Sequence, residues 1–165
     1  MIFKTNKHEK DLYNTLLALS RNIFFYTKIK LDDTFETRIY LMFIHFSIMM
    51  IIFKKKGEKF DQKSYDSLFF NIENNLRELG FGDVSVNKKM KDLNKLLYDI
   101  LLKIEVQNDL KFKINKKLII KYFKELDNEK NDKFNDFESY FVNFYNFCFE
   151  LPLKNMIREA IKFKY

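Results

Sequence analysis

Apolar residues recur every three or four positions along most of this chain, which is the spacing of one face of an α-helix. Leu12, Leu16 and Leu19 show the spacing near the start, and Leu93, Leu97 and Ile100 show it again in the middle. The pattern predicts amphipathic helices over residues 8–21, 62–79, 86–104, 116–126, 134–149 and 152–163. We expect connecting segments at 24–31, 105–115 and 127–133.

One segment is apolar on every side rather than on one face. Between Ile39 and Phe53 only His45 and Ser47 interrupt it. These fifteen residues are fewer than the roughly 20 that span a bilayer. We therefore expect the helix over about 32–55 to be a buried central helix rather than a transmembrane segment, with His45 as a hydrogen-bonded core histidine.

The three glycines and a pair of acidic residues mark the expected helix ends. Asp33, followed three residues later by Glu36, predicts a capping box at the start of the central helix. Gly57 predicts its end. Gly80 fits the left-handed position that follows a helix C-terminus, and Gly82 lies in the same turn.

Composition supports a wholly helical chain. With three Gly and one Pro in 165 residues, too few turn residues are present for an all-β fold. We predict an all-α single domain over residues 1–165, a bundle of six to seven helices around the long apolar second helix. Cys148 is the one cysteine, so an intrachain disulfide is excluded, and we expect a packed thiol.

Basic charge is concentrated in one stretch. The formal net charge is +7, and residues 88–125 hold eleven Lys against five acidic residues, which accounts for +6 of it. Arg, the residue best suited to bidentate phosphate contacts, occurs four times. An RNA-binding or ribosome-binding surface and an anionic lipid surface both stay open, whereas specific DNA binding is not expected.

Catalytic and metal-binding patterns are absent from the sequence. His8 and His45 are far apart, no Cys-x-x-Cys occurs, and Gly80-Phe81-Gly82 ends a helical pattern rather than a strand. Asp32 and Asp33 are better explained as helix-capping residues than as an acid pair. We expect no enzyme activity, no cofactor and no metal.

Two segments carry a family resemblance. Residues 31–38 read LDDTFETR and lead into the apolar helix, and residues 76–83 read LRELGFGD before a V-x-K-K-M-K run. Together with Leu12-Tyr13 and the Arg21 to Tyr26 stretch, they resemble the ubiquinol–cytochrome c chaperone family. The resemblance covers about residues 10–104. We expect residues 115–163 to form a helical C-terminal extension of this family-like region.

The resemblance implies an all-helical assembly chaperone without a cofactor, whose client is cytochrome b or another subunit of the bc1 complex. It also implies a small helper subunit and the ribosome as further partners. Residues 1–11 lack the apolar core of a secretory signal, so we expect a cytoplasmic protein, with peripheral association with the inner membrane left open.

Specific positions follow from the resemblance. The family positions are Asp33, Thr34, Arg38, His45, Arg77, Gly80 and Gly82, and the candidate partner contacts are Asp83, Lys88, Lys89 and Lys91. We also expect Arg38 to pair with a carboxylate such as that of Asp83. As a mechanism we expect a groove lined by Phe, Met and Leu to bind an apolar client helix. The alternative is a basic RNA- or ribosome-surface module without chaperone activity.

Overall fold

The computed structural model describes residues 11–128 and 132–165. Its α-helices are α1 (Asp11–Ser20), α2 (Ile23–Thr27), α3 (Phe35–Lys55), α4 (Gln62–Glu78), α5 (Asp83–Lys103), α6 (Lys116–Tyr122), α7 (Lys133–Phe149) and α8 (Leu153–Glu159). Two 3₁₀ turns follow α6 and α8, η1 (Lys124–Leu126) and η2 (Ala160–Lys162). Within these residues the β pairing is one antiparallel bridge between Glu105 and Ile114. The predicted all-α class is confirmed.

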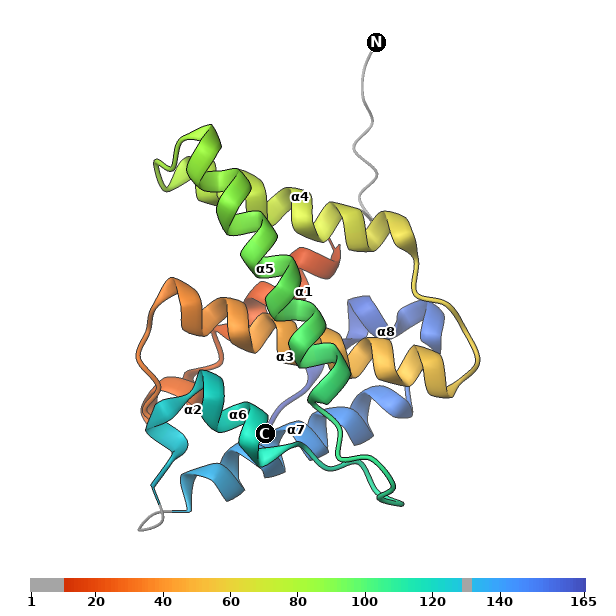
Figure 1. Cartoon of the computed structure of the whole chain (residues 1–165). Helices are drawn as coiled ribbons and strands as arrows, with labels where there is room; N and C mark the ends of the chain where they lie inside the picture. Colours follow the sequence, from red (N-terminus) through yellow and green to blue (C-terminus); the bar gives the residue numbers. More distant parts are fainter. Residues whose placement is uncertain (1–10, 129–131) are drawn as a thin grey trace.

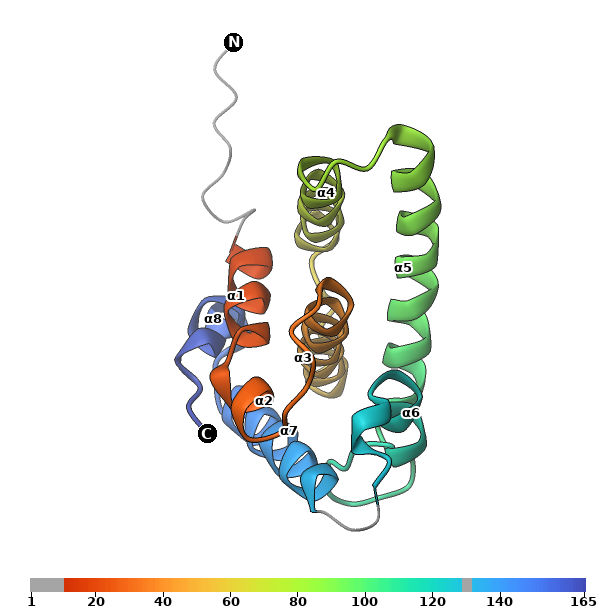
Figure 2. The same cartoon turned by 90° about the vertical axis from the view of Figure 1, so that its left-hand side faces the viewer.

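Helix α3 is the centre of the arrangement. It packs against α1, α5, α7 and α8, and Figure 2 shows it between α1 and α8 on one side and α5 and α6 on the other. It is long and apolar enough to cross a membrane, but 72% of its most apolar 18-residue window is buried inside the fold. The prediction of a buried central helix is therefore confirmed.

Every α-helix contributes to one cluster of buried side chains. Its densest part is aromatic: Phe25 of α2 and Phe141 of α7 stack with ring centroids 5.8 Å apart, and Tyr140 lies edge-on to both rings. Such ring pairs contribute beyond the area that they bury. The shared core supports the proposal that the chain forms a single domain.

Most predicted boundaries agree with the structure to within a few residues, with two exceptions. The predicted connector at 24–31 contains α2, whose first turn is capped by the Asn22 side chain. The connecting segment at 105–115 is found as predicted, between α5 and α6, where it carries the β-bridge and buries Phe112 and Ile114. The predicted helix over 116–126 is α6 followed by η1. The predicted start of the first helix at His8 lies outside the described residues, as do residues 129–131 of the predicted loop.

Helices α4 and α5 form a helical hairpin in which the two helices diverge from the turn that joins them (Figures 1 and 2). They pack against each other, and α5 also packs along α3. In Figure 1 the turn between α4 and α5 lies at the end of the hairpin farthest from α7. This arrangement exposes the turn and separates it from the opposite end of α5, near the C-terminus of α3.

Candidate functional site

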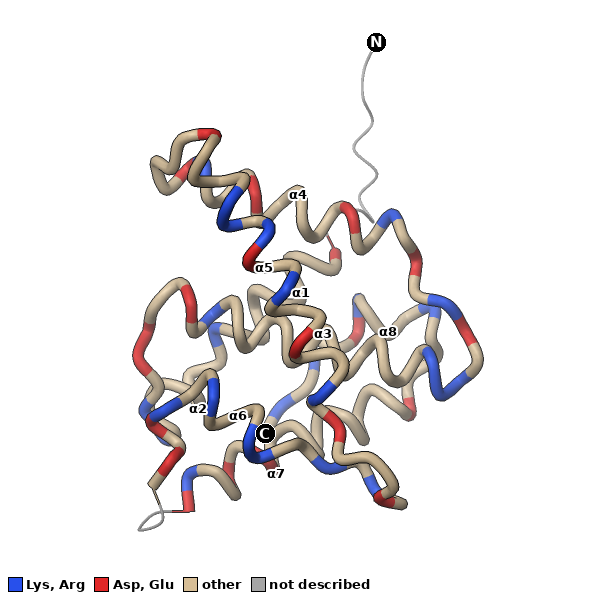
Figure 3. Tube along the Cα trace, viewed as in Figure 1, with Lys and Arg blue, Asp and Glu red and all other residues tan. Residues whose placement is uncertain are grey.

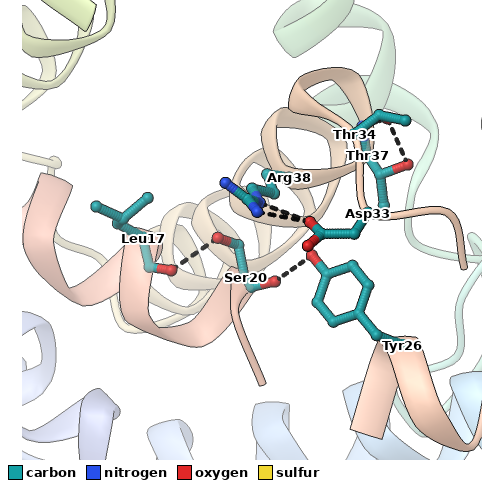
Figure 4. Close-up of polar contacts among 7 residues, drawn as sticks. All are labelled: Leu17, Ser20, Tyr26, Asp33, Thr34, Thr37 and Arg38. Carbon is teal, nitrogen blue, oxygen red and sulfur yellow. Dashed lines mark hydrogen bonds and ion pairs between the residues drawn. The ribbon is translucent and has the colours of Figure 1, made fainter. Parts of the chain in front are cut away.

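The first family segment makes two separate side-chain interactions at the start of α3 (Figure 4). Thr34 is the N-cap, because its hydroxyl accepts a hydrogen bond from the Thr37 backbone N–H at 3.1 Å. The Arg38 guanidinium binds the Asp33 carboxylate, with Nε and Nη2 at 2.8 and 2.7 Å from Oδ1. The predicted capping box of Asp33 and Glu36 is therefore wrong, because the cap falls one residue later and Asp33 is used by Arg38.

The same ion pair faces the preceding helices. The Tyr26 hydroxyl donates to the Ser20 carbonyl at 2.7 Å, and the Ser20 hydroxyl donates to the Leu17 carbonyl at 2.7 Å. Burial raises the pKa of Tyr26, and the neighbouring Asp33 carboxylate adds to this shift. Tyr26 therefore joins α2 to the end of α1, and the Asp33–Arg38 pair at the start of α3 lies beside Tyr26.

The second family segment closes the α4–α5 hairpin. Gly80 has a φ of +95°, its N–H bonds the Arg77 carbonyl, and the Phe81 N–H bonds the Leu76 carbonyl. These two bonds form a Schellman motif, which confirms the predicted helix stop at Gly80. Gly82 is the N-cap of α5, which therefore begins three residues earlier than predicted.

The ion pair predicted between Arg38 and Asp83 is absent from the described residues, because each side chain has a nearer partner. Arg77 binds Asp83 across the turn and also lies 3.1 Å from Glu73 in the preceding helical turn. In the described residues each family segment therefore forms its own local ion pair, and no ion pair joins the two segments.

The candidate partner contacts lie on the first turns of α5. Asp83, Lys88 and Lys91 are exposed, whereas Lys89 is half-buried, with Nζ 4.5 Å from the centroid of the Phe81 ring. Lys89 also lines a cavity of about 250 Å³ between α3, α4 and α5. A second cavity, of about 270 Å³, lies between α1, α3 and α4 and includes both Asp33 and Arg38.

A larger apolar groove lies at the other end of α3. A cavity of about 1020 Å³ is bounded by the ends of α3 and α5 and by the loop between α3 and α4. A neighbouring cavity of about 190 Å³ shares three of its lining residues and adds Tyr98. The apolar walls of this α3–α5 groove are Met50, Ile51, Phe60, Tyr98, Leu101 and Leu102.

Lysines border the α3–α5 groove. Lys54 and Lys59 are exposed at its edge, while Lys55 binds Glu105. The position of this groove is not evident from the sequence, although a groove lined by Phe, Met and Leu is expected. One signal was available, because Leu101 and Leu102 extend the apolar pattern of α5 beyond the stripe that packs on α3.

His45 is completely buried and satisfied. Its Nδ1 lies 2.6 Å from the Leu41 carbonyl, which accepts, and its Nε2 lies 2.9 Å from the Tyr140 hydroxyl, which donates. This confirms the expected core histidine. Burial lowers the pKa of His45 from its ordinary value to about 3, so the imidazole is neutral in the folded protein.

This buried imidazole makes stability depend on pH. The unfolded chain takes up the His45 proton near pH 6.5, whereas the folded chain resists protonation until about pH 3. The stabilisation that the folded state gains from neutral His45 is thus present above pH 6.5 and is lost as the pH falls toward 3. We expect the free energy of unfolding to drop by about 2 kcal/mol between pH 7 and pH 5 from this group.

Urea unfolding at several pH values measures this effect. The matched control is His45→Gln, which is less stable at pH 7 but lacks the titrating imidazole. We expect a clearly flatter pH dependence in the variant between pH 7 and pH 5. An identical slope in both proteins would contradict a neutral, buried His45.

The described residues contain neither a reactive cysteine nor a group of metal ligands. Cys148 is buried and burial raises its pKa to about 12, so it is not a thiolate nucleophile. Within residues 11–128 and 132–165, no group of three His, Cys, Asp or Glu side chains could hold a metal ion. The features that invite a binding partner are therefore the grooves and the exposed α4–α5 turn.

Comparison with known proteins identifies the family. A family model described as ubiquinol-cytochrome C chaperone matches residues 27–109, just over half of the chain. Searches of curated proteins and of solved structures gave no match. The matched region contains both family segments and every residue lining the α3–α5 groove, but not α1, so the resemblance proposed for α1 stays a prediction. The chain belongs to the ubiquinol–cytochrome c chaperone family, whose name implies a chaperone for the assembly of ubiquinol–cytochrome c reductase.

Proposed function

We propose that the chain is a non-enzymatic chaperone that holds an apolar segment of cytochrome b, or of another reductase subunit, in the α3–α5 groove. The observation that carries this proposal is the groove itself, which leaves a wall of Met, Leu, Ile and Phe side chains open beside the core. A subunit that is not yet assembled exposes apolar helix surface that water disfavours. An apolar groove can cover such a surface and release it later.

The dimensions of the groove suit part of a helix. A volume of about 1020 Å³ is at the upper end of sites that enclose a drug-sized molecule. It therefore accommodates a few side chains from one face of a client helix, spaced three or four residues apart. Met50 in the wall has a flexible, unbranched side chain, which lets one groove adapt to different client side chains.

The candidate contacts Asp83, Lys88, Lys89 and Lys91 belong to a different surface. They lie at the start of α5, whereas Leu101 and Leu102 lie at its end, between roughly 15 Å (Lys91 to Leu101) and roughly 29 Å (Asp83 to Leu102) away at about 1.5 Å per residue. A short segment held in the groove does not reach them. We propose that they form a second contact, separate from the groove.

Affinity purification from native membrane extract tests the proposed function. Tagged wild-type chain is compared with a Lys88/Lys89/Lys91→Glu variant, each at low and high salt. Cytochrome b or another reductase subunit recovered with the wild type, and retained at high salt, supports binding through an apolar groove. If no reductase subunit is recovered under any condition, the proposed function is wrong. The same samples show whether a small helper subunit or ribosomes are bound.

The RNA- or ribosome-surface alternative predicts a different result. Binding through phosphates weakens steeply with salt, so ribosomes recovered alone and released by salt would favour it. The structure uses part of the basic charge internally, because Lys103 and Lys121 both bind Asp99. These two bonds and a third from Tyr122 lower the pKa of Asp99 well below its usual range. No observation in the described residues favours the alternative over the groove.

A further inference from the structure

The turn between α4 and α5 carries three exposed apolar side chains. Leu79, Phe81 and Val84 are 57%, 39% and 86% exposed, and residues 79–84 are called the hairpin tip here. Figures 1 and 2 place the tip at the far end of the hairpin from α7. Phe81 and Val84 line none of the cavities described above. Among the described residues, no apolar element covers the exposed parts of these side chains, so a partner surface could bury them.

Lysines follow the tip along α5. Lys88, Lys89 and Lys91 form a basic collar on the next turns of α5. Figure 3 shows blue and red positions together near the start of α5. At about 1.5 Å per residue, Lys88 and Lys91 lie roughly 6 and 10 Å behind Val84 along the helix axis. Interfacial segments bury their apolar side chains to a similar depth of about 5–10 Å, with lysines at headgroup level.

Acidic side chains lie close to the tip as well. Glu78, Asp83 and Asp92 are exposed, and Asp83 is bound by Arg77 across the turn. Lys88 and Lys91 are exposed, and Lys89 is held against the Phe81 ring. From residue 77 to residue 92 the four basic and three acidic residues leave a net charge of +1, with three lysines behind the apolar end of the tip.

Gly82 keeps the tip free of a further side chain without being required by the fold. Its φ of −74° and ψ of 167° are open to any residue, and a Cβ there would meet nothing within 4 Å. Ser, Asp or Asn is the usual choice at a helix N-cap and would stabilise α5 at least as well. A bare backbone at this position is instead suited to close approach of a surface.

We propose that the hairpin tip inserts into the surface of a membrane that contains anionic lipid. Leu79, Phe81 and Val84 enter the boundary of the acyl chains, and the collar lysines bind lipid phosphates. A lipid surface fits better than a protein groove because the tip projects, is small, and combines exposed apolar side chains with three lysines behind them. The inference goes beyond the proposed function, since holding a client segment requires no contact between this chain and lipid.

Purified full-length chain and vesicles test the tip without any client. We expect sedimentation with vesicles of phosphatidylcholine and phosphatidylglycerol, and weak or no sedimentation with phosphatidylcholine alone. Lys88→Gln and Lys91→Gln should each weaken the binding roughly fivefold. Val84→Asp should abolish it while leaving the fold intact, because an acidic residue suits the first turn of α5. The matched control is Leu110→Asp, a fully exposed leucine in the 105–115 segment, which should bind like the wild type.

A tryptophan reporter tests insertion directly, because the chain contains no Trp. We expect the emission of Phe81→Trp to shift to the blue on anionic vesicles and to be quenched by brominated acyl chains. Leu110→Trp should show neither effect. Failure of the wild type to bind, equal binding by Val84→Asp, or an unshifted Trp at position 81 would each overturn the proposal. If Val84→Asp binds vesicles normally but loses reductase subunits in detergent extract, the tip contacts protein rather than lipid.

Discussion

Replacing Phe141 by alanine should lower the free energy of unfolding by about 3–5 kcal/mol, the usual cost of removing a buried phenylalanine ring. The ring is fully buried and lies against His45, Phe137 and Tyr140, with centroids 4.8, 4.9 and 4.8 Å away. The loss removes apolar burial and leaves a cavity where α2, α3 and α7 meet. Domains of this size are stabilised by about 5–15 kcal/mol, so the change is a large fraction of the total.

Urea unfolding followed by circular dichroism measures this change. Phe70→Ala is the matched control, because Phe70 is 61% exposed on α4 and its removal should alter stability by no more than about 0.5 kcal/mol. Equal effects of the two substitutions would mean that the aromatic cluster is not the core of the fold.

Replacing Leu102 by glutamate should weaken client binding by roughly 10- to 100-fold, since a charged carboxylate would lose water where an apolar client segment packs against it. Leu102 lies at the α3–α5 groove and is 72% exposed. Glutamate is also a good helix former, so the fold should be preserved. The measurement is the affinity of purified chain for synthetic peptides that cover the apolar helices of the reductase subunits.

The control for this substitution is Ile23→Glu. Ile23 is 70% exposed at the start of α2, where an acidic residue is also tolerated. The two variants add the same charge at equal exposure, and only the first changes the groove. Weakened binding in both variants would indicate a general charge effect rather than a contact at Leu102.

The sequence was sufficient to predict the helices for which the apolar period and the residues at the helix ends indicate the same element. Helix α3 combines a long apolar run with an N-terminal cap and a terminal glycine, and Gly57 has a φ of +75° as expected at its end. Along α7, Phe137, Phe141 and Phe144 recur every three or four residues, and all three are buried, as the helical period predicts. Agreement between apolar period and helix ends makes such elements predictable.

Other features depended on tertiary contacts. Asp33 and Thr34 are equally good capping residues, and the choice between them depends on Arg38, which binds Asp33. Helix α2 has five residues, too few for a periodic pattern, and its position depends on Phe25 packing on α7. The α3–α5 groove exists because no described helix packs over Leu101 and Leu102. A sequence does not show which helix faces remain uncovered in the folded chain.

Site-specific photo-crosslinking in native membranes tests the central claim most directly. A photoreactive side chain is placed at Leu102 in the groove and, as a control, at Ile23 on α2. The proposed function predicts an adduct with cytochrome b or another subunit of ubiquinol–cytochrome c reductase from position 102 and none from position 23. Absence of reductase subunits at position 102, or equal adducts at both positions, would contradict client binding in the α3–α5 groove.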